Sequence, residues 1–163
     1  MSPSDSSHDS PAQLARLKLE NAAWKALLEV MQEEEQALIA GDADRLALLD
    51  SAKLTQLQTV NGHARSRLAD LQAAGHTPDH PGMDAWLTQH GQPEHRAHWQ
   101  RLCEMEQVAQ AMNQRIGSLI ELRLSSTRQA LNVLVHSATS QGGLYDNAGL
   151  AVAARKGKPL TAA

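Results

Sequence analysis

The sequence predicts an all-α protein: a long antiparallel helical hairpin plus a third long helix, in a coiled-coil-like bundle with a flexible C-terminal tail. Three stretches repeat apolar residues at alternating steps of three and four, the spacing of a helical seam. Gly and Pro gather in the short connectors between these stretches. The chain has no Phe, so its core must come mainly from Leu, Ala, Ile, Val and Met, which favours packed helices over a sheet.

The first helix is expected to begin at Ser10, because Ser is a good N-cap and Pro11 suits the first helical position. Residues 1–9 are rich in Ser and Asp and are expected to be disordered. The seam consists of Leu14, Leu17, Asn21, Trp24, Leu28, Met31, Glu35 and Leu38. Its two polar members indicate a long bundle helix rather than an ideal zipper.

The second helix is expected after Gly41, with Asp42 or Asp44 as its cap. Its seam consists of Leu46, Leu49, Lys53, Leu57, Val60, Ala64, Leu68 and Leu71. Because the connector is short, two helices of about 30 residues should fold back antiparallel.

Residues 74–82 contain two Gly and two Pro, which forbid a continuous helix, and a short helical turn is expected at 83–90. The third long helix is expected from about Glu94 to Ser137. Its seam consists of Leu102, Met105, Ala109, Met112, Ile116, Ile120, Leu124, Thr127, Leu131 and Leu134. The bundle domain is therefore predicted at 10–138, followed by a mobile tail at 139–163.

Composition narrows the functional class. The net charge of -3 gives no basic footprint for nucleic acid. No apolar run approaches the ~20 residues of a membrane span, and the N-terminus lacks the features of a secretory signal. The single cysteine, Cys103, forms no internal disulfide and fits a reducing compartment. A cytoplasmic protein without stable membrane insertion is expected.

Three groups of residues could carry chemistry, and each also has a structural interpretation. The histidines of the connector region are possible metal ligands or solvated surface residues: His76, His80, His90, His95 and His98, with Asp79 nearby. Cys103 beside a histidine could be a nucleophile or a small core residue. The run at 33–35 could supply paired carboxylates, but consecutive helical residues diverge, which favours a solvated face. No catalytic or phosphate-binding motif occurs, so neither enzyme activity nor a cofactor is expected.

The third helix carries more apolar surface than one packed side requires. Wound at about 100° per residue, its seam forms one stripe, and a second lies roughly a third of a turn away. The second stripe consists of Leu119, Leu122, Ser126, Ala130 and Val133. Together the stripes span about half the circumference, whereas a helix buried on one side needs only about 100°. The surplus is covered by residues 83–90, by the tail, or by a partner, and small residues such as Gly117 allow close approach.

Several motifs resemble those of the FlgN-type flagellar export chaperones. The hairpin pattern is matched by Leu27, Leu28, Glu34, Glu35, Ala37, Leu38, Gly41, Asp42 and Leu46, followed by Lys53 and Arg65. The third helix matches at Asn113, Gly117, Leu119, Ile120, Thr127, Ala130, Leu131 and Leu134, although Ile116 replaces a family Asn. The tail element is matched by Leu144, Tyr145, Asp146 and Gly149.

The resemblance implies a cytoplasmic chaperone that binds the helical terminal region of hook–filament junction (hook-associated) proteins. Such a chaperone prevents premature assembly and delivers these clients to the cytosolic domain of the flagellar export gate. The expected client-binding residues are Gly117, Leu119, Leu122, Ser126, Ala130 and Val133. The expected gate-docking residues are Leu144, Tyr145 and Gly149. A monomer or weak homodimer is expected, and the alternative is a structural coiled-coil module that associates with itself.

Overall fold

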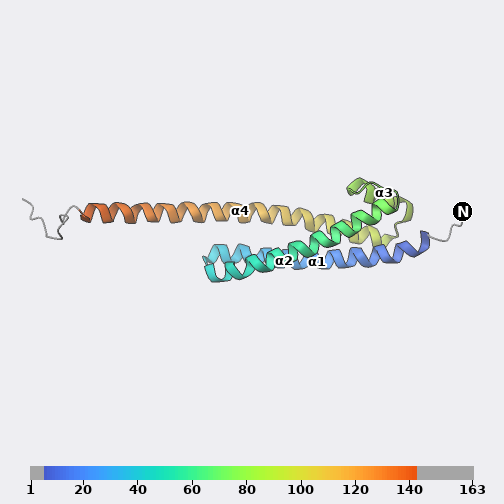
Figure 1. Cartoon of the computed structure of the whole chain (residues 1–163), viewed down its shortest axis with the longest axis horizontal. Helices are drawn as coiled ribbons and strands as arrows, with labels where there is room; N and C mark the ends of the chain where they lie inside the picture. Colours follow the sequence, from blue (N-terminus) through green and yellow to red (C-terminus); the bar gives the residue numbers. More distant parts are fainter. Residues whose placement is uncertain (1–5, 143–163) are drawn as a thin grey trace, which may run out of the picture. The chain divides into compact units, whose positions relative to one another are not determined.

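The computed structural model describes residues 6–142, and all secondary structure in this part is helical (Figure 1). The helices are α1 (Ser6–Ala40), α2 (Ala43–Ala73), α3 (His80–His90) and α4 (Pro93–Gly142). They confirm the predicted all-α class with a helical hairpin and a third long helix. The chain divides into two compact units, Met1–Ile120 and Glu121–Ala163, and each is described by itself below.

The hairpin of α1 and α2 turns where the sequence predicted. Gly41 has a φ of 73°, a left-handed conformation that costs glycine little. Asp42 then caps α2, since its carboxylate accepts a hydrogen bond from the backbone N–H of Arg45 at 2.9 Å. The two helices pack along each other (Figure 1).

Helix α1 begins at Ser6, so the predicted start at Ser10 is wrong, and residues 6–9 are helical. Pro11 lies inside the helix, where its fixed φ is compatible with helical backbone and only one hydrogen bond near the helix start is lost. Ser10 does not cap the helix but contacts α4. Its carbonyl oxygen lies 2.8 Å from Nε2 of His95. At the other end, α4 continues to Gly142, past the predicted bundle end at residue 138.

Two hydrophobic clusters hold the unit Met1–Ile120 together. The first joins α1, α2 and α4 through Ala23, Leu27, Met31, Leu38, Val60, Ala109, Met112 and Ile116. The second joins all four helices through Leu17, Leu71, Met83, Trp86, Leu87, Trp99 and Leu102. Helix α3 therefore contributes its buried face to the second cluster, and Asp79 caps its start by accepting from the N–H of Gly82 at 2.8 Å.

A buried ion pair crosses between α1 and α2 inside this unit. Glu20 and Arg67 form two hydrogen bonds, of 2.9 and 3.1 Å, and both side chains are almost completely buried. The guanidinium of Arg67 lies over the ring of Trp99, with 4.8 Å between its carbon and the ring centroid. Bidentate geometry and a ring face satisfy charges that would otherwise be costly to bury.

The predicted seam of the third helix enters the core only in its first part. Leu102, Ala109, Met112 and Ile116 are buried, as predicted. The five later members are exposed: Ile120, Leu124, Thr127, Leu131 and Leu134. The first hydrophobic cluster reaches Ile116 on α4, with Leu119 packed against it.

Candidate partner-binding surface

The apolar side chains of α4 from Ile120 onward are open to solvent. Every side chain described between Ile120 and Thr139 is exposed. Leu122, Val133 and Leu134 each keep about two thirds of their area, at 66%, 65% and 64%. Contiguous apolar area of this kind marks an interaction site rather than an ordinary protein surface. We refer to the apolar side chains within residues 119–135 of α4 as the α4 apolar surface.

The six predicted client-binding residues all lie on α4, at or just before this surface. Leu122, Ser126, Ala130 and Val133 are exposed, whereas Leu119 is half-buried and packs against the first hydrophobic cluster. Gly117 is also exposed, and a Cβ added there would meet no atom within 4 Å. Five of these residues share one side of α4: Leu119, Leu122, Ser126, Ala130 and Val133. Gly117 points to the opposite side of the helix, so the six predicted residues do not form one stripe.

Helix α3 packs within the unit Met1–Ile120. Its buried side chains, Met83, Trp86 and Leu87, belong to the second hydrophobic cluster. The predicted tail, including Leu144, Tyr145 and Gly149, lies outside the described residues from 143 onward.

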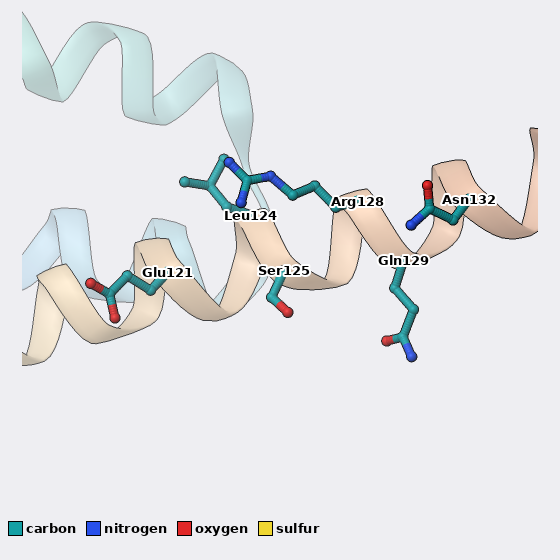
Figure 2. A pocket seen from close by; sticks show the side chains of 6 residues that line it. All are labelled: Glu121, Leu124, Ser125, Arg128, Gln129 and Asn132. Carbon is teal, nitrogen blue, oxygen red and sulfur yellow. The ribbon is translucent and has the colours of Figure 1, made fainter.

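A polar side completes the circumference of this part of α4. It carries Glu121, Ser125, Arg128, Gln129 and Asn132, which line a shallow depression together with Leu124 (Figure 2). Figure 2 shows the Arg128 side chain reaching along the helix toward Leu124. Such a stem can cover apolar surface while its charged end stays in water. The segment is thus amphipathic, with an unusually wide apolar side.

Hydroxyl groups along α4 are satisfied by the helix itself. Ser118 donates to the carbonyl of Gln114 at 3.1 Å, and Thr127 donates to the carbonyl of Arg123 at 2.9 Å. Because these donors bond to backbone oxygens four residues earlier, they present mainly small apolar surface outward.

The connector histidines are divided among separate contacts. His95 is buried, with Nε2 at 2.8 Å from the Ser10 carbonyl oxygen and Nδ1 at 3.3 Å from the backbone nitrogen of Gln92. His80 lies against Trp99, with 4.8 Å between ring centroids. Among residues with described side chains, no three His, Cys, Asp or Glu converge as metal ligands. The predicted alternative of a metal site thus finds no geometry in this part of the chain.

Cys103 is half-buried, and its Sγ lies 3.9 Å from Nδ1 of His80. Burial, followed by the carboxylates of Glu106 and Asp84, raises the pKa of the Cys103 thiol above its ordinary value. A raised pKa keeps the sulfur protonated, whereas a nucleophile requires thiolate. The thiol packs against the second hydrophobic cluster as a small apolar residue.

The acidic run at 33–35 stabilises the bundle, and the interpretation of a solvated face is wrong for its middle member. Glu33 pairs with Arg45, Glu34 with Lys53 at 2.7 Å, and Glu35 with Arg115 at 2.8 Å. Glu34 is buried. The carboxylates diverge as expected, because consecutive helical side chains point in different directions, but each meets a basic residue on another helix or beyond the turn.

The fold defines a class: an all-helical protein whose last long helix carries exposed apolar side chains. The family model described as FlgN protein matches residues 12–153, and this chain belongs to the FlgN family of flagellar export chaperones. It is therefore a chaperone of flagellum biogenesis, in a family of chaperones rather than enzymes. No curated protein and no solved structure matches the chain significantly. Within the described residues, no helix combines the length and apolar character needed to cross a membrane.

Proposed function

We propose that this chaperone binds the helical terminal region of hook-associated flagellar proteins through the α4 apolar surface. Binding would keep those clients from assembling early, in the cytoplasm, until they reach the export apparatus. The observation that supports the proposal is the exposure of every described side chain from Ile120 to Thr139, including large apolar residues on both stripes. An amphipathic client helix laid along this surface would bury them.

Moderate affinity suits this role. A client segment that is disordered when free loses conformational entropy when it becomes ordered on the chaperone, which offsets part of the contact energy. Such a complex protects the client and still releases it. Delivery to the cytosolic domain of the export gate is part of the proposal, with Leu144, Tyr145 and Gly149 as the docking element that the family resemblance implies.

The proposal predicts that Leu122→Asp or Val133→Asp abolishes client capture. Both side chains are exposed, so the charge should not disturb folding, but it would be buried without a partner once a client helix covers it. The measurement is a pull-down with a fusion protein carrying the helical terminal region of a hook-associated protein.

The matched control is Asn132→Asp, on the polar side of the same helix and turned away from both Leu122 and Val133. It should bind the fusion protein normally, and all three variants should show unchanged circular dichroism. Full capture by both Leu122→Asp and Val133→Asp would disprove the proposed surface.

A second candidate function is a self-association module. It is favoured by one observation: the exposed first stripe keeps the four–three spacing of a coiled coil through Ile120, Leu124, Thr127, Leu131 and Leu134. In that case another copy of α4 would bury the stripe.

A further inference from the structure

A shallow groove lies where the end of α1 meets α4, within the unit Met1–Ile120. We call it the tip groove. Ile39 lines it from α1, and Ala111, Ser118 and Leu119 line it from α4. Its remaining lining residues are polar: Glu35, Gln114 and Arg115.

The polar groups of the tip groove already have partners. The Arg115 guanidinium binds the Glu35 carboxylate through hydrogen bonds of 2.8 and 3.4 Å, and this pairing lowers the pKa of Glu35. Ser118 donates to its own helix. The two charges cancel, so the groove offers neutral apolar surface with a fixed polar rim that connects α1 to α4.

The apolar part of the groove is accessible. Ile39 is 63% exposed, and Leu119 is half-buried. Ala111 and Ser118 are small, which allows the backbone of a docking helix to approach closely. Burying an aliphatic side chain such as that of Ile39 against an apolar partner is favourable.

Leu119 belongs both to the tip groove and to the predicted client-binding stripe. Leu122 follows it by three residues, which places the two side chains on the same side of α4. An amphipathic helix with apolar anchors three or four residues apart that lies on Leu122 therefore reaches Leu119 with its next anchors.

We propose that the tip groove receives one end of the client helix, so that Ile39 of the hairpin is a client-binding residue beside those of α4. This inference rests on the proposed function and extends its site onto α1. The continuity at Leu119 and the neutral apolar floor specify the occupant: an amphipathic helix that presents an aliphatic side chain to Ile39.

The test is the variant Ile39→Gln, which removes apolar surface without adding a charge beside the Glu35–Arg115 pair. Leu19→Gln is the matched control, because Leu19 lies on the same helix, is 57% exposed and does not line the groove. A second variant, Ala111→Gln, fills the groove with a good helix former. The probe is a synthetic peptide of the helical terminal region of a hook-associated protein, titrated by calorimetry.

Ile39→Gln and Ala111→Gln should each weaken peptide binding about tenfold. Leu19→Gln should bind the peptide with nearly the same affinity as the unaltered protein. The inference is overturned, with the proposed function intact, if both groove variants bind normally while Leu122→Asp does not. It is also overturned if the groove variants only change the molecular mass in solution, which would make the groove a contact between two copies. If the unaltered protein does not bind the peptide, both proposals are wrong.

Discussion

The presence of Gly117 in α4 is not explained by packing among the residues that the structure describes. A glycine in a helix interior costs roughly 1 kcal/mol relative to alanine. A Cβ at this position would meet no atom within 4 Å, so no close contact requires its absence. The open space lies on the side of α4 that carries Ile120 and Leu124, three and seven residues further on. This placement is consistent with a partner helix that needs the space.

Gly117→Ala should therefore raise the free energy of unfolding by up to about 1 kcal/mol and weaken client binding. Gly62→Ala on α2 is the matched control, because a Cβ there also meets no atom within 4 Å. Gly62→Ala should stabilise to a similar degree and leave binding unchanged. Thermal unfolding and calorimetry on both variants measure the two effects. Equal client affinity in both would show that the missing side chain at 117 serves no partner.

The buried charges illustrate what residue patterns could not predict. Glu20 precedes the seam residue Asn21, and nothing in its spacing indicates a partner 47 residues away. Arg67 likewise sits beside Leu68 as an ordinary surface residue would. Only the packing of α1, α2 and α4 brings them together beneath Trp99. Asn21 interrupts the apolar seam of α1, and its side-chain amide donates a hydrogen bond to the His98 carbonyl at 3.0 Å.

At the scale of the element, periodicity predicted which side of each helix is apolar but not which length of it is buried. The first seam is largely correct, from Leu17 to Leu38. The third seam continues unchanged past Ile116, although burial stops there. A repeat in sequence reports the chemistry of one helix, whereas burial also requires a neighbour. The two apolar stripes of α4 were predictable from the sequence, but the exposure of both stripes beyond Ile116 was not.

A helix without tertiary packing has little stability of its own, because most helical stability in proteins comes from burying an apolar face. Amides of α4 between 121 and 139 should therefore exchange hydrogen faster than those between 99 and 116, whose buried side chains anchor the helix. A bound client peptide should slow exchange in the first range and change the second little. Hydrogen exchange with mass spectrometry measures both. Strong protection of 121–139 in the free protein at low concentration would contradict the view that this surface is uncovered.

At the scale of the whole molecule, the same exposed stripe supports client binding and self-association, and the two compete. The coiled-coil spacing from Ile120 to Leu134 covers only about two heptads, whereas stable coiled coils usually sustain three or four. The net charge of -3 adds a weak repulsion between copies. Self-association through this stripe alone should thus be weak.

Light scattering over a range of concentrations should accordingly give a monomer when dilute and a rising average mass when concentrated. Leu124→Asp together with Leu131→Asp should abolish that rise, because two like charges would face each other across the shared stripe. An excess of client peptide should also suppress it, since the peptide and the second copy would cover overlapping surface. A dimer whose mass persists on dilution and resists the peptide would favour the self-association module over the chaperone. A monomer at all concentrations that still binds the peptide would leave the apolar stripes to the client alone.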